Sequence, residues 1–167
     1  MQTQEITVRR AKPSDAGKIA AFVNRAWGGQ VKVDQMEVIE RFGNVGFLLA
    51  EWGDTLLGML GWQAENLVVR LTDFLIGAAS ERVAVSQALL SEMERAAGEL
   101  QCEAALLFPP RPAPAALVEF YETLGYEHRV VGDLPKAWQE AAHEGQLEKS
   151  DSVLVKKLRE KRVLRPM

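Results

Sequence analysis

The hydrophobic residues of the chain recur with two different periods, and each period indicates either a helix or a strand. Spacings of three and four residues, typical of one face of a helix, occupy four stretches. Alternating or continuous apolar runs, typical of strands, occupy seven others. The helices are predicted within residues 19–27, 36–42, 89–100 and 117–124, and the strands within residues 6–10, 47–52, 55–65, 67–76, 104–108, 126–131 and 152–158.

Glycine and proline mark the ends of several of these elements. Gly53 and Asp54 form the tight turn of a predicted hairpin. Gly125 follows the last of the four helices, at the position where a residue in the left-handed conformation commonly ends a helix. Small residues at 77–80 predict a loop. The proline-rich stretch 109–114 predicts a stiff loop, because proline has no N–H to donate.

The order of the elements predicts the fold class. One strand, two helices, three strands, a helix, a strand, a helix and two strands imply an α/β protein with a mixed sheet and helices on both faces. Neither a linker nor an internal repeat divides the sequence, so residues 1–167 are expected to form a single domain. Residues 131–151 are an insert between the last two strands, with a surface helix at 135–143, and residues 159–167 are a tail.

Charge and composition exclude several classes of function. The chain has 167 residues, 47% of them hydrophobic, and a net charge of −3, which is the balance of an ordinary globular protein. This charge creates no field that would hold a polyanion, so nucleic acid is not an expected partner. The clearest basic run, Lys156 to Arg165, is expected to be solvated.

Few residues could hold a metal or a disulfide. Cys102 is the single cysteine and is expected to be buried, which excludes an intramolecular disulfide framework and a multi-cysteine zinc site. The only histidines, His128 and His143, lack the spacing of metal ligands, so no metal site is expected. Residues 1–5 do not look like a signal peptide, and no apolar run approaches the ~20 residues that span a bilayer. A cytoplasmic protein without a membrane partner is therefore expected.

One segment carries a family resemblance. Residues 120–127, Phe-Tyr-Glu-Thr-Leu-Gly-Tyr-Glu, closely resemble the "FYEKLGF" segment of the GNAT superfamily of N-acetyltransferases. The first strand with the turn at Pro13–Asp15, the hairpin at Gly53 and the last strand also look like elements of this family. The resemblance covers nearly the whole chain and implies a single GNAT-like domain with a mixed, mostly antiparallel sheet of about seven strands.

The resemblance also implies a binding site for acetyl-CoA as a co-substrate. In the family, a turn with the pattern Gln/Arg-x-x-Gly-x-Gly/Ala leads into a helix, and backbone N–H groups there hold the pyrophosphate. The pattern falls on residues 81–86, where Glu81, Ala84 and Ser86 depart from it. Arg82 could supply the missing positive charge and Ser86 a hydroxyl donor. The implied acyl-CoA contacts are Leu75, Ile76, Arg82, Val83, Ala84, Val85, Ser86 and Gln87. The other interpretation is an ordinary helix start that has lost its ligand.

The same resemblance suggests roles in a direct attack of an amine on the thioester. Tyr121 would be the acid that protonates the departing thiolate, and a backbone N–H near Leu75 or Ile76 would donate to the oxyanion. Asp73 is the first candidate for the base, because it alternates in register with apolar residues of its strand; Glu65 is the second, and a water chain could replace either. Alternatively, Tyr121 is an amphipathic helix residue that packs on the sheet.

These observations favour an N-acyltransferase that moves an acetyl or acyl group from acyl-CoA to a small-molecule amine or a protein amino group. The alternative is a catalytically inactive member of the same fold that binds another ligand or serves as a regulatory or protein-interaction module. Residues 81–86 discriminate between the two, because phosphate binding precedes any chemistry. A homodimer formed by strand exchange or edge pairing is compatible with both interpretations.

Overall fold

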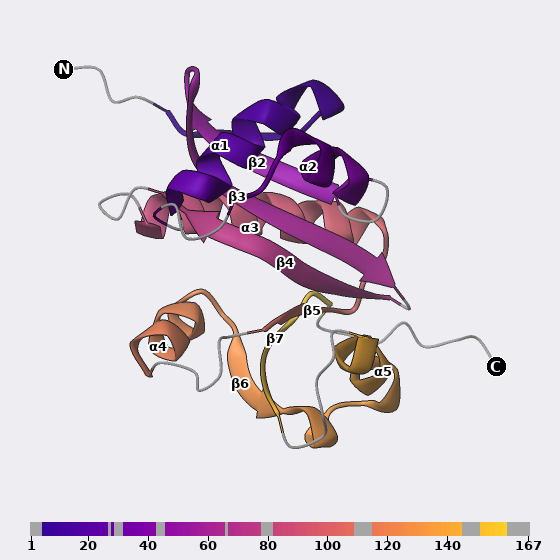
Figure 1. The fold of residues 1–167 in the computed structure, drawn as a ribbon. Helices are drawn as coiled ribbons and strands as arrows, with labels where there is room; N and C mark the ends of the chain where they lie inside the picture. The colour runs from indigo at the N-terminus through magenta and orange to yellow at the C-terminus, as the bar shows by residue number, and fades with distance from the viewer. Residues whose placement is uncertain are drawn as a thin grey trace. The chain divides into compact units, whose positions relative to one another are not determined.

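In a computed structural model, residues 5–26, 28, 32–42, 46–65, 67–77, 82–108, 115–144 and 151–159 are described. Two short 3-10 turns, at Pro13–Asp15 and Val131–Asp133, accompany the helices and strands. In chain order the helices and strands are β1 (Thr7–Arg10), α1 (Ala16–Ala26), α2 (Gln35–Arg41), β2 (Gly46–Trp52), β3 (Thr55–Glu65), β4 (Val68–Ile76), α3 (Arg82–Glu99), β5 (Ala104–Leu107), α4 (Ala115–Thr123), β6 (Glu127–Val130), α5 (Lys136–Glu144) and β7 (Ser152–Lys157) (Figure 1).

The strands form a seven-stranded sheet in the order β1-β2-β3-β4-β5-β7-β6. β4 and β5 are parallel, with Val68 opposite Ala104. The pairs β1–β2, β2–β3, β5–β7 and β6–β7 are antiparallel. The predicted mixed, mostly antiparallel sheet of about seven strands is therefore confirmed. The last two strands pair as predicted, and β7 lies between β5 and β6.

The chain divides into two compact units. Unit 1 comprises residues 1–63 and 72–93, and unit 2 comprises residues 64–71 and 94–167. β3, β4 and α3 each contribute residues to both units. Some predicted features, among them the end of the first helix at Trp27, the loop at 78–80 and the proline-rich loop at 109–114, lie outside the described residues.

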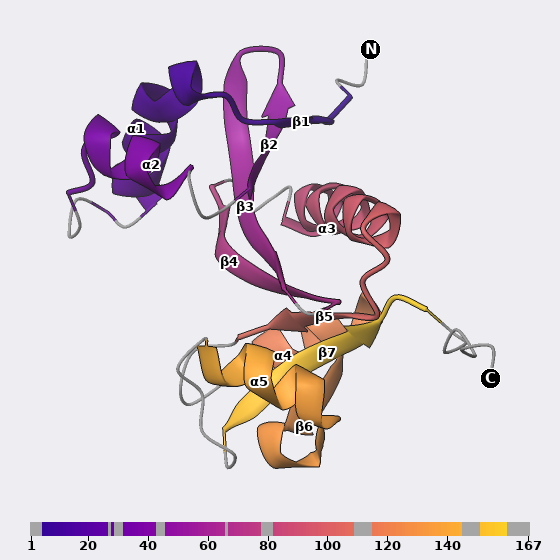
Figure 2. The same cartoon turned by 90° about the vertical axis from the view of Figure 1, so that its right-hand side faces the viewer.

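Unit 1 is a layered structure in which α1 and α2 lie on one side of β2 and β3 and α3 lies on the other (Figure 2). The predicted stripe of α1 is buried, with Ile19 and Phe22 only 1% and 3% exposed. One cluster joins these helices to the strands, and its buried members are Ala16, Ile19, Ala20, Phe22, Val38, Phe47, Leu49, Leu56 and Met59. The three- and four-residue spacing of the sequence thus corresponds to the core of this unit.

A network of charged side chains ties β1 to the start of α1 and to β2. The Arg9 guanidinium donates to both carboxylate oxygens of Asp15, at 2.9 Å each, and through Nε to Glu51 at 2.7 Å. Lys18 donates to the other oxygen of Glu51. The Asp15 carboxylate also accepts from the backbone N–H of Lys12 at 2.7 Å, as expected of a residue that caps the start of a helix.

These contacts shift the pKa values of both carboxyls. The hydrogen bonds from Arg9 lower the pKa of Asp15 to about 2. For Glu51, burial raises the pKa, but hydrogen bonds from Arg9 and Lys18 outweigh it, so the net shift is downward. The folded state therefore binds protons at Asp15 less tightly than the unfolded state does. The ion pairs contribute stability above pH ~4, and this contribution falls as the pH drops from about 4 towards 2.

We expect Asp15→Asn to lower the free energy of unfolding at pH 7 by about 1–2 kcal/mol, a value reduced because the Arg9 side chain is 40% exposed. The difference from wild type should shrink as the pH falls from 4 to 2. Urea unfolding at several pH values measures it. Asp54→Asn in the exposed β2–β3 turn is the matched control and should change stability little. A difference that stays constant between pH 4 and pH 2 would contradict the assignment.

Unit 2 has its own core, which α5 helps to form. The buried members of this core are Val68, Ala104, Leu106, Val131, Leu134, Trp138, Ala141, Ala142, Val153 and Val155. The predicted helix at 135–143 is confirmed, but its expected place on the surface is wrong. Trp138, Ala141 and Ala142 follow the three- and four-residue spacing of a buried face and are at most 8% exposed, so α5 covers β5 and β7 (Figure 2).

Candidate active site

The N-terminal end of α3, which starts at Arg82, belongs to unit 1. The helix has 18 residues, and its first turn contains no acidic residue. The N–H groups at the start of a helix have no partner inside it, and here these include Arg82, Val83 and Ala84. All three side chains are exposed, and the positive end of the helix dipole lies at the same place. This end of α3 is therefore suited to bind an anion.

Close packing holds the first turn of α3 against the sheet. Val85 is completely buried. A Cβ on Gly58 of β3 would lie only 2.7 Å from Val85 Cγ1 and 3.1 Å from the carbonyl oxygen of Leu75. Only glycine leaves room for this approach, so Gly58 determines how closely α3 lies on β3 and β4.

A second glycine sets the end of β4. The N–H of Gly77 donates to the carbonyl of Leu57 at 2.8 Å. A Cβ at position 77 would lie 2.7 Å from the Phe22 ring of α1. The end of β4 is therefore in close contact with α1.

The predicted phosphate contacts differ in accessibility. Arg82, Val83, Ala84 and Gln87 are exposed, whereas Val85 and Ser86 are buried. The Ser86 side chain is 1% exposed, and its Oγ has no hydrogen-bond partner among the described residues. Because α3 starts at Arg82, the N–H groups from Val85 onward belong to the helical ladder. Glu81 lies outside the described residues.

Tyr121 lies on α4 in unit 2, and its side chain is 9% exposed. Its ring centroid is 5.3 Å from that of Phe120 and 6.4 Å from that of Tyr126. Its backbone carbonyl accepts from the N–H groups of Leu124 and Tyr126, at 3.0 and 3.1 Å. Gly125 has φ +96°, so the predicted left-handed end of this helix is confirmed.

The other predicted catalytic groups lie on β3 and β4. Leu75 and Ile76 are partly buried near the end of β4, and the Asp73 side chain lies outside what is described. Glu65, at the end of β3, forms an ion pair with Arg70 at 3.5 Å. Arg70 was not among the predicted residues, and it has the opposite parity along β4 to Asp73. Its 9% exposure is unusual for arginine.

Comparison with known proteins identifies the fold. No protein-family model matches the chain, and no curated protein matches its sequence. Solved structures do match. A GNAT acetyltransferase from Staphylococcus aureus Mu50 is 15% identical with a TM-score of 0.68, over 93% of this chain and 100% of that one. The PaiA N-acetyltransferase of Thermoplasma acidophilum, in complex with coenzyme A, is 15% identical with a TM-score of 0.66, over 92% and 99%. The chain has the GNAT fold.

A third similar structure is the ribosomal-protein-S18-alanine N-acetyltransferase of Escherichia coli, at 12% identity and a TM-score of 0.67 over 98% of this chain and 100% of that one. Identities of 12–15% show the fold and leave the activity open. The predicted GNAT-like architecture is therefore confirmed.

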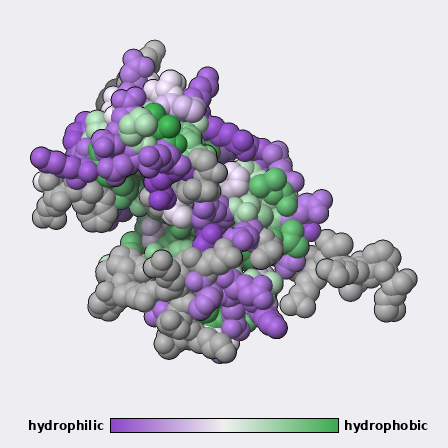
Figure 3. Space-filling model, turned by 45° about the vertical axis from the view of Figure 1, so that its right-hand side comes forward, coloured by the Kyte–Doolittle hydropathy of each residue, from purple (hydrophilic) through white to green (hydrophobic). Residues whose placement is uncertain are grey.

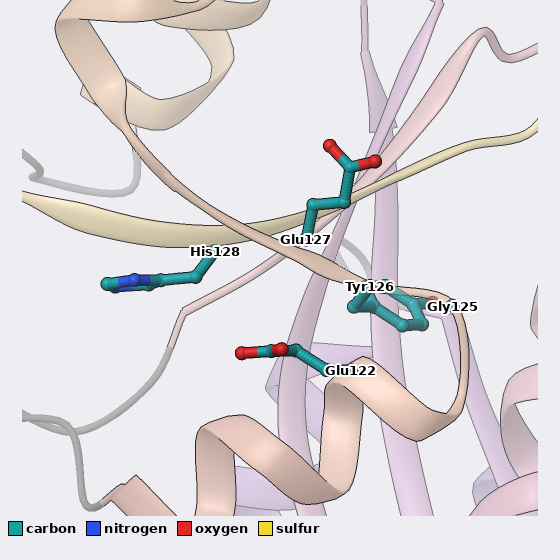
Figure 4. Close-up of a pocket in the computed structure, with 5 residues that line it drawn as sticks. All are labelled: Glu122, Gly125, Tyr126, Glu127 and His128. Carbon is teal, nitrogen blue, oxygen red and sulfur yellow. The ribbon is translucent and has the colours of Figure 1, made fainter.

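A pocket of about 560 Å³ opens on unit 2 of this GNAT fold, beside the end of α4. Its lining residues are Glu122, Gly125, Tyr126, Glu127 and His128. Figure 4 shows the Glu122 and His128 side chains extending to one side, while the Glu127 carboxylate points away from them. Glu127 is bound by Arg129 at 2.6 Å. The Glu122 carboxylate in its lining makes this pocket unsuited to the phosphates of coenzyme A.

The cysteine and the two histidines of the chain suggest no other chemistry. Cys102 is buried, as predicted, and burial raises the pKa of its thiol, which disfavours the nucleophilic thiolate. His128 and His143 are both exposed. The described residues contain no group of three or more histidine, cysteine or acidic side chains that could hold a metal ion. None of the described helices is long and apolar enough to cross a bilayer.

The surface is mostly polar where Figure 3 shows it, with hydrophobic side chains in small groups among hydrophilic ones. Among the described residues, the exposed large hydrophobic side chains are Met36, Leu67, Val83, Leu100 and Val130. In the same order, they lie in α2, between β3 and β4, in the first turn of α3, directly after α3, and in β6. Single exposed apolar side chains of this kind are ordinary.

Proposed function

We propose that the chain is an N-acyltransferase that transfers an acetyl or acyl group from acyl-CoA to an amine. The nitrogen forms a bond to the thioester carbonyl carbon, and the bond from that carbon to sulfur breaks. The amine loses a proton to a base, and the departing thiolate gains one from an acid. The acceptor is a small-molecule amine or a protein amino group.

The exposed start of α3 is the observation that carries this proposal. The N–H groups that have no partner inside the helix, the lack of acidic residues in its first turn and the cation of Arg82 are the features that bind phosphate at a helix N-terminus. One similar structure, from T. acidophilum, contains coenzyme A. We therefore assign the pyrophosphate of acyl-CoA to Arg82, Val83 and Ala84. The buried Ser86 hydroxyl has a smaller part in this assignment than the N–H groups do.

The catalytic roles remain those suggested by the sequence. Tyr121 is the proposed acid, because a phenol with an ordinary pKa near ~10 can donate a proton to a departing thiolate. The N–H groups of Leu75 and Ile76 are the proposed oxyanion donors. Asp73 is the preferred base. Glu65 is less favoured, because its carboxylate is held by Arg70.

Calorimetric titration of acetyl-CoA and free coenzyme A into the purified protein tests the binding step. We expect micromolar affinity, and we expect Ala84→Asp to weaken it by about tenfold or more, because a carboxylate would lie beside the phosphates. An acid in the first turn of a helix raises helix stability by about 0.3–1 kcal/mol, so weaker binding would not reflect unfolding. Ser91→Asp, an exposed site further along α3, is the matched control.

Three outcomes are informative. Equal loss of affinity in Ala84→Asp and Ser91→Asp would place the phosphates elsewhere. Binding only after Glu81→Gln would attribute the loss of function to the carboxylate of Glu81. No binding by the wild type or by Glu81→Gln, with the fold verified by circular dichroism, would overturn the acyltransferase proposal and favour a binding or regulatory module of the same fold.

A further inference from the structure

An ion pair inside unit 2 has no part in the reaction proposed above. Lys156 lies in β7 and Glu94 in the second half of α3, and Nζ is 2.7 Å from Oε1. The two side chains are only 29% and 20% exposed. We propose that Lys156 and Glu94, acting through Tyr126 and the end of α4, are positioning residues that set the orientation of the Tyr121 ring. This proposal rests on the proposed role of Tyr121 as the acid.

Lys156 was expected in a solvated basic run, and the structure corrects this. Its ammonium donates to Glu94 and, at 3.2 Å, to the backbone carbonyl of Leu124. It also lies 5.8 Å from the centroid of the Tyr126 ring, within the range of a cation–π contact. Lys156 thus contacts a carboxylate, the end of a helix and an aromatic ring at once. A solvated surface lysine does not make such a set of contacts.

Glu94 and Tyr126 complete the cluster. The Tyr126 hydroxyl donates to Glu94 Oε2 at a long 3.4 Å, and the ring is 1% exposed. Burial, followed by the charge of Glu94, raises the pKa of the Tyr126 hydroxyl, so this phenol stays neutral at ordinary pH. Without Lys156, the Glu94 carboxylate would keep, among the described residues, only this long bond in a partly buried place. Removing the cation is therefore expected to rearrange the group rather than leave it intact.

Tyr121 is attached to this cluster at two points. Its carbonyl accepts from the N–H of Leu124, whose own carbonyl Lys156 binds, and from the N–H of Tyr126. Its ring lies edge-on to the Tyr126 ring at an angle of 70°. Both the backbone and the ring of Tyr121 therefore depend on atoms that Lys156 and Glu94 hold in place.

The turn after α4 is shaped to admit the lysine. A Cβ on Gly125 would lie 3.1 Å from Lys156 Cε and 3.4 Å from Nζ. The same residue has φ +96°, a conformation that other residues rarely adopt. Glycine at this position thus both ends α4 and leaves room for the lysine side chain to reach Leu124 and Glu94.

Two tyrosines make this proposal measurable without activity. Tyr121 and Tyr126 are the only ones in the chain, so carbon NMR of protein labelled on the tyrosine rings gives two sets of signals. Tyr121→Phe and Tyr126→Phe assign them. We expect Lys156→Met to shift or broaden the signals of both rings, and Lys156→Arg to restore them in part. Lys157→Met, at the exposed next residue, is the control and should leave both unchanged.

Kinetics then separate positioning from a merely structural role. We expect Lys156→Met to lower kcat by about 10- to 100-fold with KM for acetyl-CoA within about twofold of wild type, because small displacements of a catalytic group reduce turnover strongly. Lys156→Arg should recover most of the loss. If Lys156→Met does not fold, Glu94→Gln, which keeps the shape and removes the charge, takes its place in every measurement.

Two results would overturn the proposal. One is a Tyr121 signal in Lys156→Met that coincides with wild type while only the Tyr126 signal moves. The other is a raised KM with kcat unchanged. Failure of the acyltransferase proposal gives a different result, because the wild-type protein would then transfer no acyl group. In that case the tyrosine NMR signals alone decide whether Lys156 and Glu94 position the Tyr121 ring.

Discussion

Replacement of Tyr121 by phenylalanine is expected to lower kcat about 100-fold or more, while the affinity for coenzyme A stays within about twofold of wild type. The substitution removes only the hydroxyl, so the thiolate would leave without a proton donor. The phenyl ring keeps the apolar volume that packs against Phe120 and Tyr126 on α4. Steady-state kinetics with acetyl-CoA and an accepted amine, together with calorimetry of coenzyme A, measure the two quantities.

Tyr126→Phe is the matched control, because it makes the same chemical change at the neighbouring tyrosine. Within the described part of the chain, its hydroxyl contacts Glu94 alone, at a long 3.4 Å, so we expect kcat to fall less than about tenfold. An unchanged kcat in Tyr121→Phe would remove Tyr121 from the role of acid and leave it as a packing residue of α4. Equal losses in both variants would point to a shared structural effect.

Gly58→Ala is expected to destabilise the protein by about 1–3 kcal/mol and to weaken coenzyme A binding. The new Cβ would meet Val85 Cγ1 at 2.7 Å, Ile76 Cδ1 at 3.0 Å and the Leu75 carbonyl at 3.1 Å. The Val85 side chain can shift, but the carbonyl of a paired strand cannot do so easily. This cost exceeds the stabilisation of about 0.4–1 kcal/mol that a Gly→Ala change gives by lowering the conformational entropy of the unfolded chain. Urea unfolding gives the change in stability.

Gly98→Ala is the control with the opposite expected sign. Gly98 lies near the end of α3, and a Cβ there would meet no atom within 4 Å. Alanine favours a helix over glycine by about 0.5–1 kcal/mol, so this variant should be more stable than wild type and bind coenzyme A equally well. If Gly58→Ala were as stable as wild type, the close approach of α3 to β3 would not be tight.

Binding measurements on Gly58→Ala connect the fold to the site. Val85 is the fourth residue of α3, directly after the three residues whose N–H groups have no partner inside the helix. A shift of Val85 away from β3 would therefore move the proposed phosphate site. We expect the affinity for coenzyme A to fall at a temperature where the variant is still fully folded.

Much of the local structure was predictable from the sequence. The stripe that contains Ile19 and Phe22 marked α1, and the turn at Gly53 marked the hairpin of β2 and β3, because helix and strand periods and turn residues act over short distances. Gly125 likewise ended α4 as expected, since the left-handed conformation favours glycine. Tyr121 was placed on a buried helix face by the same reasoning.

Other features depended on contacts between distant residues. The α5 helix was predicted, but whether Trp138 lay on the surface or in a core depended on the strands that it met. Lys156 looked like part of a basic tail, because its partner Glu94 is 62 residues away in the chain. The network of Arg9 and Glu51 was also not recognised, since the two residues meet only through the pairing of β1 with β2.

The sequence by itself determined the type and order of the helices and strands and the ends that glycine marks. Its resemblance to the GNAT superfamily also predicted the fold. These depend on local periods and on short motifs. Only the tertiary structure decided that Ser86 is buried while Arg82, Val83 and Ala84 are exposed, because the side of α3 that faces the sheet is set by the packing of Val85 on Gly58. Residue types carry no record of such long-range packing, so the accessible part of the phosphate site could be identified only after folding.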